Sequence, residues 1–180
     1  MKTILAVGAL TAAVASAASA DVTYTLTNQT FAGFAFSEAA TAGSLSGTLT
    51  GASINVVLNA SVSYTYADDL CVYVAGTPLA TGGMLQCGGF SNLSAAQRYF
   101  WPNGASSAPG TTSIGTVNFT TGIDMAANPT MSVWIGNGYG AAGTSGTFSG
   151  TITLHGVNAV PAPGAIALLG LVGLAGRRRR

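Results

Sequence analysis

Residues 62–74 read Val62-Ser63-Tyr64-Thr65-Tyr66-Ala67-Asp68-Asp69-Leu70-Cys71-Val72-Tyr73-Val74. Apolar and aromatic side chains occupy every second position on both sides of the central acidic pair. This period of two indicates β-strands, because successive side chains of a strand point to opposite faces of the sheet. The stretch therefore predicts two strands joined at the acidic pair.

The same alternation recurs through most of the chain, and Gly- and Pro-containing segments separate its occurrences. About eight short strands with regularly spaced turns are typical of an antiparallel β-sandwich. We therefore expect an all-β domain with a jelly-roll-like sandwich over residues 21–159. The further alternating segments are residues 22–27, 54–58, 114–119, 131–135 and 148–154.

Two segments depart from the strand pattern. Residues 91–99 predict a short helix, with Asn92 or Ser94 as its N-terminal cap. The glycine-rich residues 136–140 predict a turn, since no helix follows the G-x-G pattern that they contain.

Charged side chains make up only 6% of the chain, against about 25% in an average soluble protein. Lys2 and the four C-terminal arginines lie at the two ends, which leaves Arg98 against five acidic residues in between. A mildly acidic body of this kind argues against binding to nucleic acid, which requires clustered cations. Polarity comes instead from Thr, Ser and Asn, as is usual in extracellular β-rich domains.

The N-terminus predicts a secretory signal helix over residues 1–20, outside the folded domain. Lys2 precedes an apolar run at residues 4–14, and Ala18-Ser19-Ala20 forms a small-x-small cleavage site. Signal peptidase would then cut between Ala20 and Asp21. The alternative is a retained N-terminal anchor helix.

The C-terminus, residues 160–180, combines three features. Pro161-Ala162-Pro163-Gly164 breaks any helix, and residues 165–175 form an apolar run that predicts a short helix outside the domain. As a helix this run spans about 20 Å, against a hydrocarbon core of about 30 Å, which favours transient membrane insertion. The cytoplasmic side would retain Arg177, Arg178, Arg179 and Arg180. The alternatives are a buried core helix and a basic nucleic-acid-binding tail.

This order of Pro-x-Pro, apolar helix and arginine cluster resembles the PEP-CTERM sorting signal. The resemblance implies that an exosortase in the inner membrane cuts near Pro161 and Pro163. It further implies that the mature protein remains at the cell surface or in the exopolysaccharide matrix. Ala162 stands where the motif that names the family has Glu, so a tail that is not cut and stays as an anchor is the alternative.

The body carries a second resemblance, confined to residues 62–74 and 148–154. These stretches resemble the core strands of proprotein-convertase P domains. The resemblance implies a jelly-roll sandwich and carries no catalytic residues.

Cys71 and Cys87 are the only cysteines, and they flank the turn-forming residues 76–83. An even number of cysteines in an exported chain predicts a disulfide. Closing such a loop is worth about 3 kcal/mol in the chain-entropy model. The alternative is two free buried thiols.

Residues 98–101, Arg98-Tyr99-Phe100-Trp101, place three aromatic side chains beside the only basic residue of the body. Aromatic rings stack on sugars, and Arg adds polar contacts, so this segment is the candidate for glycan contact. The alternative is that the rings plug one end of the sandwich and that Arg98 pairs with an aspartate.

Catalytic and metal sites are not predicted. We expect Asp68 and Asp69 to be a solvated pair at a strand edge, with a weak Ca²⁺ site as the alternative. His155 is the only histidine, and no G-x-S-x-G motif accompanies it, so we interpret it as structural. No cofactor is expected.

The sequence therefore predicts an exported structural or adhesive surface protein that is not an enzyme. A carbohydrate-binding module for exopolysaccharide is the alternative, and a secreted hydrolase is the third hypothesis.

Overall fold

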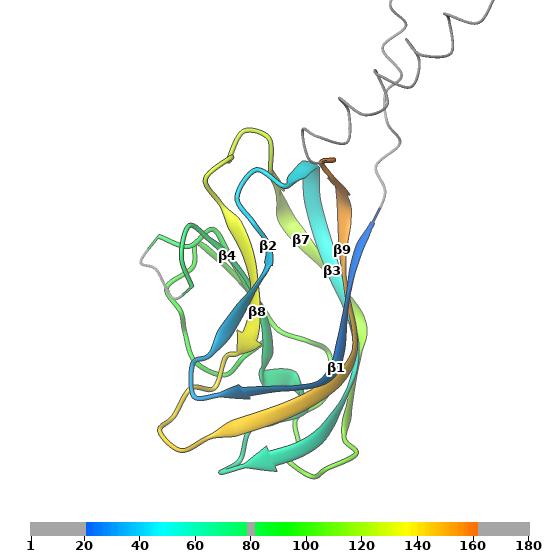
Figure 1. Cartoon of the computed structure of the whole chain (residues 1–180), viewed down its shortest axis with the longest axis vertical. Helices are drawn as coiled ribbons and strands as arrows, with labels where there is room; N and C mark the ends of the chain where they lie inside the picture. Colours follow the sequence, from blue (N-terminus) through cyan, green and yellow to red (C-terminus); the bar gives the residue numbers. More distant parts are fainter. Residues whose placement is uncertain (1–20, 79–81, 162–180) are drawn as a thin grey trace, which may run out of the picture.

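The computed structural model describes residues 21–78 and 82–161, and they fold into nine β-strands in two sheets (Figure 1). Neighbouring strands are antiparallel, except that β5 and β6 are parallel. The first sheet has the order β1 (Val22–Ala32), β9 (Ser145–Ala159), β3 (Leu45–Val62) and β7 (Thr112–Asp124). The second has the order β2 (Phe36–Ala40), β8 (Ser132–Asn137), β4 (Leu70–Ala75), β5 (Leu85–Cys87) and β6 (Gln97–Tyr99). The all-β class is thereby confirmed.

The main core is a single cluster to which both sheets contribute buried side chains. Strand β3 shows the expected alternation, because Ile54, Val56 and Leu58 are buried whereas Asn55 is exposed. Leu70 and its alternate neighbours on β4 enter the same cluster from the second sheet. The remaining predicted strands at residues 22–27, 114–119 and 148–154 lie within β1, β7 and β9.

Strand β4 is buried on both faces, which its alternating sequence did not predict. Cys71, Tyr73 and Ala75 point away from the main core and form a second cluster with Leu93. The Tyr73 hydroxyl donates a hydrogen bond of 2.8 Å to the carbonyl oxygen of Leu93. The segment that precedes β6 thus covers the outer face of β4.

That covering segment is not the predicted helix. Residues 91–96 have no helical structure, and Gln97–Tyr99 pairs with β5 as strand β6. The Asn92 side chain accepts a hydrogen bond from the amide of Ser94 and closes a tight turn. Sheet pairing and burial of Leu93 therefore outweigh the weak local preference for helix.

Two further local predictions were wrong in part. Strand β3 ends at Val62, and a short 3-10 turn, η1 (Ala67–Asp69), precedes β4, so residues 63–66 are not a strand. At the predicted turn of residues 136–140, Gly136 and Asn137 instead belong to β8, where Gly136 pairs with Phe36 and Cys71.

The predicted signal peptide at residues 1–20 lies outside the described residues, as does the part of the predicted sorting tail beyond Pro161. None of the described residues belongs to a helix with the length and hydropathy needed to cross a membrane. The described chain ends at the upper end of the molecule in Figure 1, where β9 terminates.

Candidate functional site

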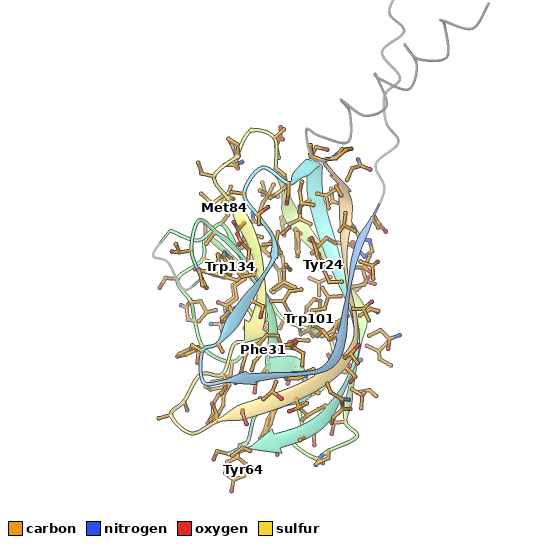
Figure 2. All side chains as sticks on the ribbon, in the orientation of Figure 1. Tyr24, Phe31, Tyr64, Met84, Trp101 and Trp134 are labelled. Atoms are coloured by element: carbon orange, nitrogen blue, oxygen red, sulfur yellow. The ribbon has the colours of Figure 1, made fainter. Side chains whose placement is uncertain are left out.

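A hollow of about 410 Å³ opens where four connecting segments meet, which are those between β3 and β4, β5 and β6, β6 and β7, and β8 and β9. Most of its wall consists of aromatic rings, and we call it the aromatic pocket. Figure 2 places Tyr64 at the end of the molecule opposite the end of β9. The lining residues are Tyr64, Tyr66, Asp68, Asp69, Gly89, Phe90, Phe100, Trp101, Ala105 and Tyr139.

The turn after β3 presents Tyr64 to this pocket. Ser63 and Tyr64 both adopt left-handed backbone conformations, with φ of 54° and 67°. Such conformations are unfavourable for residues with a Cβ atom and occur in tight turns, and strained residues of this kind cluster at functional sites. Here they leave the Tyr64 side chain 74% exposed, next to Tyr66.

Phe90 and Tyr139 form the opposite wall. Their rings meet edge to face, with centroids 6.0 Å apart. The Ser91 hydroxyl donates to the carbonyl oxygen of Tyr139 at 2.6 Å and so ties the two loops together. Gly89 lies so close to Gly138 that a Cβ atom on Gly89 would be 2.7 Å from the Gly138 Cα, which requires glycine there.

Asp69 links two of the segments that line the pocket. One carboxylate oxygen accepts a hydrogen bond from the Tyr66 amide at 2.7 Å, and the other accepts one from the Phe90 amide at 3.1 Å. Burial raises the pKa of Asp69 to about 6, against the opposing effect of these bonds. Because both oxygens are occupied, Asp69 is not the solvated strand-edge residue that we expected.

Asp68 is half-buried, and its carboxylate accepts no hydrogen bond from another residue in the described ranges 21–78 and 82–161. Burial raises the pKa of this carboxyl group as well. The same ranges contain no group of three or more His, Cys, Asp or Glu side chains that could hold a metal ion. In these ranges the structure therefore places no third side chain of these types with Asp68 and Asp69 to complete a calcium site.

The predicted glycan segment divides between the core and the pocket. Trp101 is only 5% exposed, and its indole nitrogen donates to the Leu70 carbonyl oxygen at 2.7 Å. Tyr99 packs on Phe119 with ring centroids 4.9 Å apart. These two rings pack against the domain, as the alternative interpretation stated, although Trp101 also forms part of the pocket lining. Phe100, in contrast, is 60% exposed and lines the pocket.

Arg98 does not pair with an aspartate. Its guanidinium lies 4.7 Å from the centre of the Phe100 ring and donates a 2.5 Å hydrogen bond to the Phe90 carbonyl oxygen. It does not line the pocket. Arg98 therefore supports the pocket wall from behind.

The sequence prediction missed Tyr64, Phe90 and Tyr139. Tyr64 was assigned to a strand, and the other two are isolated aromatic residues in glycine-rich segments. An isolated aromatic residue between turn formers was the one available signal, since such a ring has no strand face to pack on.

The predicted disulfide is absent, because both cysteines are free and buried. Cys87 lies opposite Val72 in the β4–β5 pair, so its side chain points into the main core. Cys71 is the neighbour of Val72 and points to the other face, into the second cluster. Burial raises the pKa of both thiols, which disfavours the reactive thiolate.

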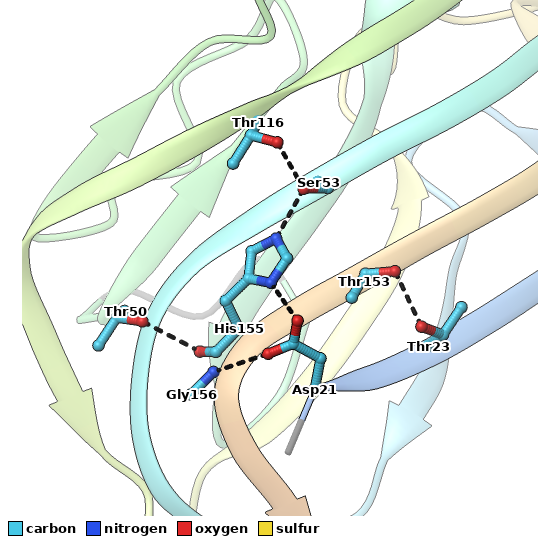
Figure 3. Close-up of polar contacts among 8 residues, drawn as sticks. All are labelled: Asp21, Thr23, Thr50, Ser53, Thr116, Thr153, His155 and Gly156. Carbon is cyan, nitrogen blue, oxygen red and sulfur yellow. Dashed lines mark hydrogen bonds and ion pairs between the residues drawn. The ribbon is translucent and has the colours of Figure 1, made fainter. Parts of the chain in front are cut away.

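A second constellation lies on the outer face of the first sheet (Figure 3). His155 Nδ1 is 2.7 Å from a carboxylate oxygen of Asp21, and His155 Nε2 is 2.6 Å from Ser53 Oγ. The Ser53 hydroxyl also contacts Thr116 Oγ1 at 2.7 Å. His155 was expected to be structural, and only strand register reveals that residues distant in sequence flank it.

The connectivity of this second constellation is that of a Ser-His-Asp triad. Its surroundings are less favourable to acyl transfer. Ser53 lies on β3 between β7 and β9, so its backbone is enclosed by strand pairing on both sides. A hollow beside His155 and Asp21 does not include Ser53 in its lining. An oxyanion needs free N–H donors next to the nucleophile, and sheet pairing leaves few there.

Comparison of the chain with protein-family models, curated proteins and solved structures finds no significant match.

Proposed function

We propose that the protein is an exported surface domain with a jelly-roll β-sandwich fold that binds carbohydrate in its aromatic pocket. The strand orders β1-β9-β3-β7 and β2-β8-β4-β5 support the jelly-roll assignment, since they correspond to two interlocked Greek keys. The signal peptide and the PEP-CTERM-like tail support export and retention in the envelope or exopolysaccharide matrix. In this proposal the domain acts by adhesion.

The observation that carries the binding proposal is the group of exposed rings around one hollow. Tyr64 and Phe90 are each 74% exposed, and Phe100 is 60% exposed. Single exposed apolar side chains are common, but a contiguous group of exposed rings marks an interaction site or a ligand-binding groove. The apolar face of a pyranose ring stacks on such rings, and nearby polar groups hydrogen-bond its hydroxyls. Tyr64, one of the lining residues, lies at the end of the molecule opposite the end of β9, after which the predicted anchor follows (Figure 2).

Binding of the purified protein to an array of bacterial polysaccharides tests this proposal. Phe90→Ala and Phe100→Ala should weaken binding at least about tenfold, because each removes one stacking surface. Phe34→Ala is the matched control, since Phe34 is 40% exposed but lies outside the lining. Equal binding by all three variants and the unaltered protein would contradict the assignment of the pocket.

Export and sorting are tested separately by mass spectrometry of the secreted fraction. We expect a chain that starts at Asp21 and ends near Pro163. An intact chain that ends in Arg180 would contradict cleavage by an exosortase and would favour the retained-anchor alternative.

A secreted hydrolase remains the second candidate, because Asp21, His155 and Ser53 lie in contact. In that reaction Ser53 Oγ would attack an ester carbonyl while His155 Nε2 takes the serine proton and passes it to the leaving alcohol, which leaves the acyl group on Ser53. Water would then attack this acyl group, give a proton to His155 Nε2 and release the acid, and the proton would return to Ser53 Oγ. A fluorophosphonate probe tests it. Labelling of Ser53 that disappears in His155→Ala would support hydrolysis, and absence of labelling would contradict it.

A further inference from the structure

The aromatic pocket contains two carboxylates and no basic side chain among its lining residues. Arg98 is the only Lys or Arg in the described ranges, and its guanidinium is engaged with Phe90 and Phe100 behind the wall. The one ion pair found within those ranges joins Asp21 and His155, on the other sheet. Neither carboxylate of the pocket therefore forms an ion pair with another residue in the described part of the protein.

Asp68 is the carboxylate available to a ligand. Asp69 uses both oxygens to accept the amides of Tyr66 and Phe90, whereas Asp68 accepts no hydrogen bond from another described residue. The hydrogen bond that the Asp68 carboxylate does accept comes from its own backbone amide. A half-buried carboxylate of this kind has lost hydrogen bonds to water, and a cation that donates N–H groups replaces them. The pocket thus offers a ligand one anionic hydrogen-bond acceptor, Asp68, among aromatic side chains.

Aromatic faces add to this preference. The negative face of a Tyr or Phe ring attracts a cation that lies within about 6 Å of its centre. An uncharged sugar gains stacking alone from such a wall, whereas a sugar with an ammonium group gains stacking, cation–π attraction and an ion pair. The pocket, at about 410 Å³, is also large enough for a sugar unit rather than a small ammonium ion alone.

We propose that the aromatic pocket selects a polysaccharide with free amino groups, built from glucosamine units that are not N-acetylated. This inference rests on the proposed carbohydrate binding and specifies its ligand class. The ammonium group would donate to Asp68, and the apolar face of the same ring would stack on Phe90 or Phe100. N-acetylation removes the charge and leaves Asp68 without its partner, so it should weaken binding.

Titration calorimetry with two hexasaccharides of equal length tests the proposal. One is the fully deacetylated β-1,4-glucosamine hexamer, and the other is its fully N-acetylated form. We expect the unaltered protein to bind the deacetylated hexamer at least about tenfold more tightly. Its affinity should fall as NaCl is raised from 50 to 500 mM, roughly, because salt screens the partly exposed ion pair.

Asp68→Asn should abolish the preference for the deacetylated hexamer while Phe90→Ala weakens both hexamers. Glu38→Gln is the matched control, because it removes one negative charge from an exposed position on β2, outside the lining. It should leave both affinities unchanged. The salt dependence of the unaltered protein keeps the proposal testable if Asp68→Asn does not fold.

The outcomes separate the two proposals. Equal affinity for both hexamers, with loss in Phe90→Ala, would overturn the selection of amino groups and leave carbohydrate binding intact. Binding of neither hexamer, nor of any polysaccharide on the array, would contradict carbohydrate binding itself. A preference that survives Asp68→Asn would overturn the assignment of Asp68.

Discussion

The outer faces of the two sheets differ in their exposure to water. The sheet β1-β9-β3-β7 exposes a surface of Thr and Ser, on which Thr23 and Thr153 share a hydrogen bond of 2.8 Å. The sheet β2-β8-β4-β5-β6 has the outer face of β4 buried under the segment that contains Leu93. The aromatic pocket is built from the loops of this second sheet and the turn that enters it.

This difference explains why the candidate binding site lies where it does. Long regular strands satisfy their backbone groups within the sheet, and their polar outer faces contact water without further support. Short strands leave the intervening loops to be packed and hydrogen-bonded by side chains, and loops fixed in this way can hold rings in defined positions. The first sheet is therefore a scaffold, and the second carries the site.

The largest effect is expected when one outer-face side chain on each sheet is replaced by Ala. Tyr73→Ala should lower the free energy of unfolding by about 3–5 kcal/mol, because Tyr73 is fully buried in the second cluster. Thr153→Ala, on the outer face of the first sheet, should change it by less than about 0.5 kcal/mol. Urea denaturation measures both. Similar effects would mean that the two outer faces do not differ.

A smaller effect is expected from Asp69→Ala. The amides of Tyr66 and Phe90 lose their acceptors, so unfolding should become easier by about 1–3 kcal/mol. Asp124→Ala is the matched control, since Asp124 also accepts two amides, from Ala126 and Ala127, but at an exposed turn where water replaces it. A larger effect of the Asp124 change in thermal denaturation would contradict the structural role of Asp69.

The pH dependence of the two regions should have opposite signs. Burial raises the pKa of Asp69 to about 6, so its contribution to stability is greatest below about pH 4 and decreases as the pH rises toward 6. The hydrogen bond to His155 lowers the pKa of Asp21, so its contribution is present above pH 3.8 and is lost as the pH falls further. Carboxyl ¹³C titration by NMR measures both midpoints. If both carboxyl groups titrated with midpoints near 3.8, the predicted opposite pH dependence of the two regions would be wrong.

The smallest expected effect is that of a reducing agent. Because Cys71 and Cys87 point to opposite faces of the second sheet, dithiothreitol should leave the thermal midpoint unchanged. Iodoacetamide should modify both thiols only after unfolding, since both are buried. A drop in the midpoint on reduction would show that the two cysteines are bonded in the purified protein.

Periodicity predicted the long strands well, because each has one face in the core and one toward water. Residues 54–58 and 148–154 show this clearly, as they lie inside β3 and β9. It failed at β5 and β2, which are short and carry no repeated alternation, and it extended β3 too far, because Tyr64 and Tyr66 continue the pattern into a turn. The alternation of apolar side chains therefore predicts a strand only where those side chains are the buried ones.

The sequence by itself determined the all-β class and the low charge, since composition and nearest-neighbour spacing carry that information. The tertiary structure alone decided which partners meet. Strand register placed Cys71 and Cys87 on opposite faces and brought Asp21 and Ser53 to His155. Loop packing buried Trp101 and left Phe90 exposed beside Asp68. These contacts join residues far apart along the chain, so they depend on how the sheets pair and pack.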